Sequence, residues 1–194
     1  VERWAQICAP GEDVHLAADR DNPEDYATVE ALAWAAREAG LGAHFTALSE
    51  IGVSDEGQLA DDKDRVIGTL FKLYPWEDML RDDFAAHLQP SHARFIEPPW
   101  KAVLSNKGLL PHLWAMAPGH PNLLPAFFEE DPAKASLGRS FVRKPLFSRE
   151  GANILIVRDG AVLARAEGPY GEEGTIRQGL AELPDLDGRR PLIG

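Results

Sequence analysis

In the first third of the chain, the spacing of apolar residues switches between strand and helix periodicity. Residues 13–19, DVHLAAD, and residues 43–48, AHFTAL, are short apolar runs typical of buried strands. Between them, apolar residues recur at helical spacing at Val29, Leu32, Ala33 and Ala36. Asn22 can cap this helix, Pro23 suits its first turn, and Gly40 is a natural stop. The pattern predicts a βαβ unit with two parallel strands.

The middle of the chain predicts one more strand and then mainly helices. Residues 65–73 read as a third strand, and residues 75–88 as a helix that opens at Pro75. Residues 97–119 predict one or two helices, and Pro111 either opens or kinks the second. The proline-rich residues 120–135 are expected to form an ordered loop. Three tryptophans are expected in the core: Trp76, Trp100 and Trp114.

From Ser140 onward the apolar residues alternate with period two. Three runs read as strands: residues 140–148, 152–168 and 174–183. Asp159-Gly160 divides the middle run, and this dipeptide favours a type I′ hairpin turn. We therefore expect an antiparallel sheet here. The whole chain is predicted to be α+β, or mixed α/β.

Composition and charge narrow the classes of function. The 194 residues carry 31 acidic and 20 basic side chains, and the formal net charge is −11. This balance argues against nucleic acid and anionic membranes as partners, because both attract basic surfaces. There is no run of about 18 apolar residues and no visible signal peptide, so a cytoplasmic location is expected. The single cysteine, Cys8, is interpreted as a small buried apolar residue.

The strongest candidate chemistry is a group of cations in the second half of the chain. Lys107 lies in SNKGLL, where a helix begins or is broken, and Lys144 lies in a predicted strand. By the period of two, Lys144 shares its face with Val142, so it needs an anionic partner or an open cleft. Arg149 and Glu150 open a turn whose small residues offer backbone N–H groups to an anion. From these residues alone, a solvated hairpin edge with an internal Arg–Glu pair is the favoured interpretation.

Five runs, in this order, carry a resemblance to a known family: LFKLYPWEDMLRDDF, IEPPWKAVLSNKGLLPHLW, GHPNLLPAFF, RKPLFSREGANI and GPYGEEGTIRQGLAELP. Together they resemble the glutathionylspermidine synthase family, and more closely its stand-alone synthetase-like members. The resemblance is strong from Leu70 to Gly194 and looser before that. It implies an ATP-grasp ligase, which forms an acyl phosphate from a carboxylate and ATP before an amine displaces the phosphate. The implied substrates are a glutathione-like acid and a polyamine-like amine, with ATP and Mg²⁺ as cofactors.

The resemblance also implies roles for individual residues. Lys107 and Lys144 match the two lysines that bind the ATP phosphates, and Arg149 matches the catalytic arginine of a mobile loop. Four residues would make loop contacts with the phosphates: Ser148, Gly151, Ala152 and Asn153. Three would line the adenine pocket: Gln178, Gly179 and Leu180. Glu150 is the metal-ligand candidate, as in the related glutathione synthetases.

Two departures from the family pattern shape the remaining expectations. The family's main magnesium ligands lie upstream of the matching region, and its later strands lie beyond PLIG. We therefore expect an incomplete and inactive segment, truncated at both ends. Residues 1–90 would be a pre-ATP-grasp-like βαβ portion, and residues 91–194 a partial ATP-grasp domain with the antiparallel sheet. The alternatives are a non-catalytic module that binds nucleotide or a partner, or a purely structural domain.

Overall fold

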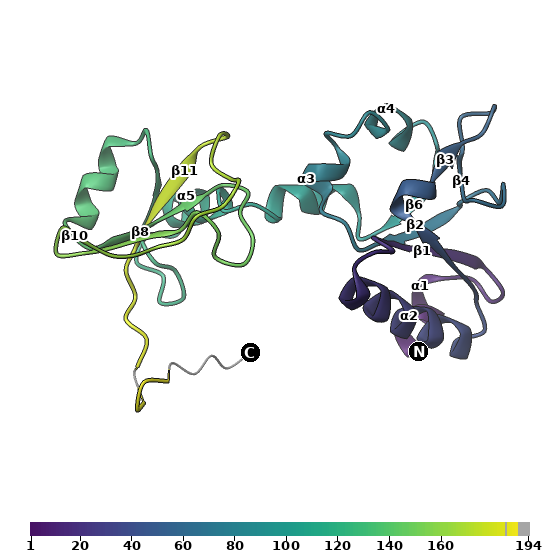
Figure 1. Ribbon diagram of the computed structural model, residues 1–194, viewed down its shortest axis with the longest axis horizontal. Coiled ribbons are helices and arrows are strands. Elements are labelled where there is room, and N and C mark those ends of the chain that lie inside the picture. Colours follow the sequence, from purple (N-terminus) through teal and green to yellow (C-terminus); the bar gives the residue numbers. More distant parts are fainter. Residues whose placement is uncertain (185, 190–194) are drawn as a thin grey trace. The chain divides into compact units, whose positions relative to one another are not determined.

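The computed structural model describes residues 1–184 and 186–189, and the chain packs as two compact units, Val1–Ser105 and Asn106–Gly194 (Figure 1). The division expected from the sequence, between residues 90 and 91, stays a prediction. The main elements of the first unit are α1 (Glu2–Ile7), β1 (Asp13–Ala18), α2 (Pro23–Glu38), β2 (Gly42–Ala47), β3 (Gly52–Val53), β4 (Leu59–Ala60), β5 (Thr69–Lys72), α3 (Trp76–Met79), α4 (Ala85–Leu88) and β6 (Arg94–Ile96). Short 3-10 turns follow β2 (η1, Leu48–Glu50) and β6 (η2, Pro99–Leu104).

A parallel sheet forms the centre of the first unit. Its strand order is β2-β1-β5-β6, and all three neighbouring pairs are parallel. The βαβ prediction is confirmed: β1 and β2 flank α2, and the Asn22 side chain accepts hydrogen bonds from the N–H groups of Glu24 and Asp25.

Both faces of this sheet are buried, because alternate residues of β1 serve two cores. Val14, Leu16 and Ala18 pack with residues of α1 and α2, which lie beside this sheet in Figure 1. Ala17, on the other face, belongs to a second core that contains Trp76. This explains why five consecutive residues of β1 are buried.

The second unit is built on an antiparallel sheet with the strand order β10-β9-β8-β11-β7, as the alternating pattern predicts. Its elements are α5 (Leu109–Met116), β7 (Ala126–Phe128), η3 (Pro132–Leu137), β8 (Phe141–Pro145), β9 (Leu155–Arg158), β10 (Ala161–Arg165) and β11 (Thr175–Gly179). Asp159 and Gly160 join β9 to β10 with φ angles of 52° and 84°, as a type I′ turn requires.

Four expectations about the middle of the chain were wrong in detail. The helix expected over residues 75–88 is two single turns, α3 and α4, separated by residues 80–84, where Asp82 and Asp83 are poor helix formers. The third strand covers only Thr69–Lys72 of the expected residues 65–73. The loop expected at residues 120–135 contains β7, which pairs with β11 at the edge of the sheet. Trp76 is buried, but Trp100 is 61% exposed.

Pro111 lies in the first turn of α5 and so opens that helix, where its missing N–H is not needed. Cys8 is buried, as expected, and accepts a hydrogen bond from the Arg94 guanidinium. Within the described residues, no helix has the length and apolar character that crossing a membrane would require.

Candidate functional site

Lys144 stands on the same face of the second sheet as buried apolar residues. It lies directly opposite Ile176 of β11, which is fully buried. Its ammonium donates a hydrogen bond of 2.7 Å to the side-chain oxygen of Gln178, two residues further along β11. Burial lowers the pKa of the Lys144 ammonium. The predicted half-buried lysine on an apolar face is therefore present.

Lys107 lies in the turn just before α5 and is attached to the segment that follows β8. Its backbone N–H donates to the Leu146 carbonyl at 3.0 Å, and its ammonium donates to the Ser148 carbonyl at 2.6 Å. The next residue, Gly108, leaves little room for a side chain, because a Cβ there would lie 2.7 Å from the Asn106 side-chain oxygen.

The segment of Lys107 and the side chain of Lys144 border the same face of the sheet. Phe128, Ile176 and Lys144 are directly opposite one another across β7, β11 and β8, so their side chains share one face. A Cβ at Gly108 would contact Phe128 and Leu146 at 3.5 Å each. The structure thus brings the two predicted phosphate lysines to one side of the sheet, from separate elements.

Ser148 begins the predicted phosphate loop and has an unsatisfied hydroxyl. Ser148 is 6% exposed, and its Oγ has no hydrogen-bond partner among the described residues. Buried hydroxyls are normally paired, so this unpaired hydroxyl is a candidate hydrogen-bond donor. The backbone carbonyl of Ser148 accepts a hydrogen bond from the Lys107 ammonium, so this short segment brings together a hydroxyl and a cation.

The loop from Arg149 to Asn153 is exposed at its tip and has an unusual backbone. Glu150, Gly151 and Asn153 have positive φ angles of 50°, 78° and 55°. Such angles are uncommon for residues other than glycine; they cost free energy and persist only where the surrounding structure holds them. The Ala152 N–H donates to the Arg149 carbonyl at 2.9 Å, so this group is occupied within the loop.

Asn153 fastens the end of this loop to the glycine-rich segment before β11. Its amide donates to the Gly168 carbonyl at 2.8 Å, and its side-chain oxygen accepts from the Tyr170 N–H at 2.9 Å. Asn153 also lines a cavity of about 330 Å³ with Arg143 and Arg165. Arg143 is on the opposite face of β8 from Lys144, so this cavity is separate from the lysine face.

The remaining predicted site residues lie at the end of β11. Gln178 is buried and holds Lys144, while the Gly179 N–H donates to the Pro125 carbonyl at 2.8 Å. Leu180 is partly buried next to them. Glu150 is exposed, and no group of three or more His, Cys, Asp or Glu residues able to hold a metal occurs in the part of the chain that the structure describes.

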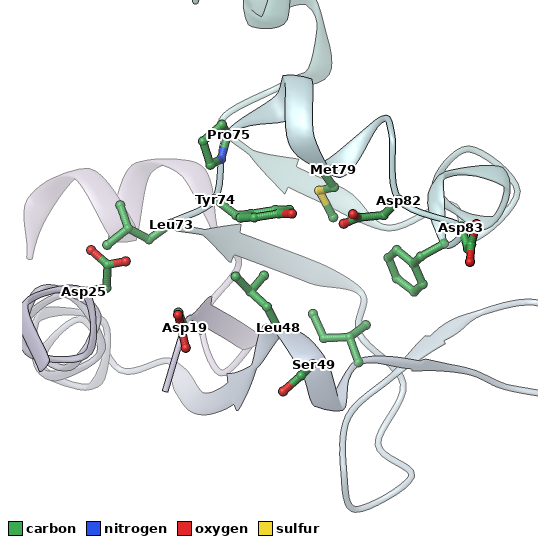
Figure 2. A pocket seen from close by; sticks show the side chains of 12 residues that line it. Asp19, Asp25, Leu48, Ser49, Leu73, Tyr74, Pro75, Met79, Asp82 and Asp83 are labelled. Carbon is green, nitrogen blue, oxygen red and sulfur yellow. The ribbon is translucent and has the colours of Figure 1, made fainter. Parts of the chain in front are cut away.

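A larger cavity, about 640 Å³, lies in the first unit and was not expected from the sequence. Figure 2 shows its lining residues, which come from the segments that follow β1, β2 and β5 and from the first turn of α2 and the α3–α4 region. Asp19 directly follows β1, Ser49 lies just after β2, and Tyr74 just after β5. The sequence signal for this cavity was Asp19, an aspartate placed directly after a buried strand.

Comparisons with known proteins agree with this architecture. Residues 1–194 match a family model described as "Glutathionylspermidine synthase preATP-grasp". A Haemophilus influenzae protein named "Putative acid--amine ligase" is 43% identical over 192 residues, which are 94% of this chain and 48% of that protein. The bifunctional glutathionylspermidine synthetase/amidase of Escherichia coli K12 is 31% identical over 202 residues, which are 91% of this chain and 32% of the relative. The chain therefore spans half or less of the length of these relatives.

Solved structures show the same fold at low sequence identity. D-cycloserine synthetase DcsG has a TM-score of 0.54 and 20% identity, over 91% of this chain and 62% of that chain. The ATP-grasp ligase PsnB, solved with a phosphomimetic variant of its minimal precursor, Mg and ADP, has a TM-score of 0.50 and 12% identity, over 91% and 68%. The parallel sheet followed by an antiparallel sheet is thus an arrangement found in ATP-grasp ligases.

Proposed function

Because the chain belongs to the glutathionylspermidine synthase pre-ATP-grasp family, we propose that it is part of an ATP-dependent acid–amine ligase. In this reaction a carboxylate oxygen attacks the γ-phosphorus of ATP, which yields an acyl phosphate and ADP. An amine nitrogen then attacks the acyl carbon, phosphate leaves, and the nitrogen loses a proton to give the amide. The phosphoryl step depends on positioning and on neutralising charge more than on covalent help from the protein.

The observation that carries the proposal is the pair of lysines on one face of the second sheet. Lys144 is held by Gln178 and Lys107 by the Ser148 carbonyl, so both ammonium groups are oriented by hydrogen bonds. A polyphosphate held between two such groups would have its charge neutralised from two sides. The Ser148 hydroxyl, which has no partner within the described residues, supplies a further donor for a phosphate oxygen.

The loop from Arg149 to Asn153 has the properties of a lid over these phosphates. Its tip is exposed, and Gly151 adopts its φ angle of 78° without steric cost. Closing it would bring the Arg149 guanidinium toward the charge that develops in phosphoryl transfer, and it would shield the acyl phosphate from water. Arg149 would then be the catalytic residue of the loop. Ser148 and Gly151 would contact the phosphates directly, and Ala152 and Asn153 would do so once closure releases the hydrogen bonds that hold them.

Two further groups of residues would bind the adenine base and the metal ion. Backbone groups around Gln178, Gly179 and Leu180 would bind the base. Glu150 is the carboxylate that would hold Mg²⁺, and the ion would supply positive charge to neutralise the phosphates. One exposed carboxylate binds a metal ion only weakly. The proposed roles of Lys107 and Lys144 are independent of whether Glu150 binds Mg²⁺.

The names of the relatives suggest the substrates. The Escherichia coli relative is a glutathionylspermidine synthetase/amidase, and a 29% identical relative from Crithidia fasciculata is a trypanothione synthetase. A glutathione-like peptide is therefore the proposed acid, and a polyamine-like molecule the proposed amine. The cytoplasm is the proposed location.

The direct test is nucleotide binding by the full-length protein that contains this chain. Lys144→Met removes the ammonium but keeps an apolar stem, so the sheet should still fold. We expect its affinity for ATP, measured by calorimetry, to fall roughly tenfold or more, as for the loss of a charge-assisted hydrogen bond.

Lys63→Ala is the matched control, because Lys63 is exposed and belongs to the first unit. It should leave ATP affinity unchanged. Equal affinity in Lys144→Met, wild type and the control would eliminate the assignment of the phosphate site.

A further inference from the structure

One face of the second sheet carries a row of arginines that the proposed ATP site does not use. Arg177 of β11 lies directly opposite Arg143 of β8. Leu155 of β9 lies opposite Arg143 on one side and opposite Arg165 of β10 on the other. Because residues directly opposite one another share a face, the three arginines are on the same side of the sheet. Lys144 follows Arg143 in β8 and is therefore on the other side.

The charges of these three arginines are balanced to different degrees. Both oxygens of the Glu129 carboxylate accept hydrogen bonds from Arg177, at 2.6 and 2.9 Å. Arg165 pairs with Glu167 at 3.0 Å, but both side chains are more than half exposed, so this pair is weak. The Arg143 guanidinium has no hydrogen bond or ion pair with any residue in the part of the chain that the structure describes. A bound anion would offset the repulsion between Arg143 and Arg177, since like charges directly opposite one another are destabilising.

Arg143 and Arg165 both line the cavity of about 330 Å³ in this unit. Neighbouring strands are about 5 Å apart, so the two arginines, which lie two strands apart, start about 10 Å from each other. Their long side chains can therefore reach one anion from two sides, above Leu155. A guanidinium binds the oxygens of a phosphate or carboxylate through two parallel hydrogen bonds.

The rest of the lining indicates which anion fits. Leu155 supplies apolar surface between the two arginines, and Tyr170 supplies an aromatic ring. The volume is at the lower end of the range typical of small-molecule sites, about 300–1,000 Å³, so the cavity holds more than a bare ion. Two guanidinium groups match a phosphate monoester, which carries close to two negative charges above its second pKa of about 6. The Glu172 carboxylate, which also lines the cavity, opposes this binding.

We propose that this cavity binds a phosphate monoester with a small apolar group, as an anion site on the opposite face of the sheet from Lys144. The phosphate would lie between Arg143 and Arg165, and the organic group would lie against Leu155 and Tyr170. The proposal rests on these four residues and is independent of the proposed ligase activity.

The test is calorimetric binding of phenyl phosphate to the full-length protein that contains this chain, at pH 8 and low ionic strength, without nucleotide. Benzyl alcohol has the ring without the charge, and inorganic phosphate has the charge without the ring. We expect each of them to bind roughly tenfold more weakly than phenyl phosphate, because each lacks one half of the interaction. Benzyl alcohol or inorganic phosphate binding as tightly as phenyl phosphate would overturn the proposal.

Two arginine variants test the cations of the site. Arg143→Met removes the unpaired guanidinium and keeps an unbranched stem in β8, and affinity for phenyl phosphate should fall roughly tenfold, as for a lost charge-assisted hydrogen bond. Arg165→Met changes an exposed side chain on the edge strand β10, so the fold should tolerate it. Its affinity should fall roughly threefold, because an exposed charge contributes less. Glu172→Gln removes the opposing carboxylate and should raise the affinity by up to about threefold.

Arg139→Met is the matched control, because Arg139 is an exposed arginine of the same unit that does not line the cavity. It should change the affinity by less than about twofold. Absent binding in wild type, an unchanged affinity in Arg143→Met or Arg165→Met, equal losses in Arg143→Met and Arg139→Met, or weaker binding in Glu172→Gln would each overturn the proposal.

The variant Lys144→Met separates this site from the proposed ATP site. It should bind phenyl phosphate as wild type does, and Arg143→Met should bind ATP as wild type does. Loss of phenyl phosphate binding in Lys144→Met would place the ester on the lysine face and overturn the second anion site. If Lys144→Met binds ATP normally, the assignment of the ATP phosphates fails, and the result with phenyl phosphate still decides the arginine site.

Discussion

At the scale of single residues, Lys72 shows how the first unit tolerates a buried cation. Lys72 is 4% exposed. Its ammonium donates a hydrogen bond of 2.8 Å to the Tyr74 carbonyl and lies 4.1 Å from the centre of the Trp76 ring. Burial lowers the pKa of Lys72 to about 8, although the carboxylates of Glu97 and Glu77 oppose this shift. Lys72 therefore anchors the segment that leads from β5 into the cavity wall, although burying its charge costs free energy.

This pKa predicts how stability depends on pH. Between pH 8 and 10.5 the unfolded chain keeps the Lys72 proton that the folded chain has lost, so folding becomes more favourable as pH rises. The gain is at most about 3 kcal/mol by pH 10.5. In Lys72→Met it should be missing, so urea denaturation should show the stability difference between the two proteins changing across this window. Parallel pH profiles for the two proteins would show that Lys72 is not titrating there.

Residue chemistry was only partly visible in the sequence. The period of two was enough to place Lys144 on the buried face of β8, and the structure confirms its partial burial. Its partner Gln178 and the orphan hydroxyl of Ser148 depend on strand register and on a turn. The pattern of a single strand shows neither the Lys144–Gln178 pair nor the unpaired Ser148 hydroxyl, because each depends on segments distant in the chain.

At the scale of elements, the cap of α2 connects local structure to the cavity. Asn22 accepts hydrogen bonds from the Glu24 N–H at 3.0 Å and the Asp25 N–H at 3.3 Å, and Asp25 lines the cavity. The cap therefore both begins the helix and fixes one of the cavity's carboxylates.

Asn22→Ala should lower the free energy of unfolding by about 1 kcal/mol, because two N–H groups lose their acceptor. Asn22→Asp keeps an acceptor and should restore most of that stability. Urea denaturation of the three proteins is the measurement. If alanine and aspartate have the same effect, the cap contributes little to stability.

Elements with strong local signals were predictable, and those held by distant contacts were not. The cap, the helical spacing and Gly40 were sufficient for α2, and Asp159-Gly160 for the β9–β10 hairpin. The strand β7 is three residues long in a proline-rich segment and exists because β11 pairs with it. Its formation is a tertiary effect that local propensity does not encode.

At the scale of the whole molecule, the two units have complementary charge. The first offers a cavity with four aspartates, and the second offers Lys107 and Lys144 on one sheet face. The net charge of −11 hides this division, because it sums the acidic and basic side chains of both units. The ordered motifs were enough to predict the family and the fold, whereas the cavity required three strand ends to be brought together.

The most direct test of the central claim is ADP formation by the full-length protein with ATP, Mg²⁺, glutathione and spermidine. We expect ADP release to require the acid, to be accompanied by an amide product when the amine is present, and to be lost in Lys144→Met but kept in Lys63→Ala. Wild-type protein that binds ATP but forms no ADP with glutathione-like acids and polyamines would contradict a ligase. That result would favour a module that binds nucleotide without catalysis.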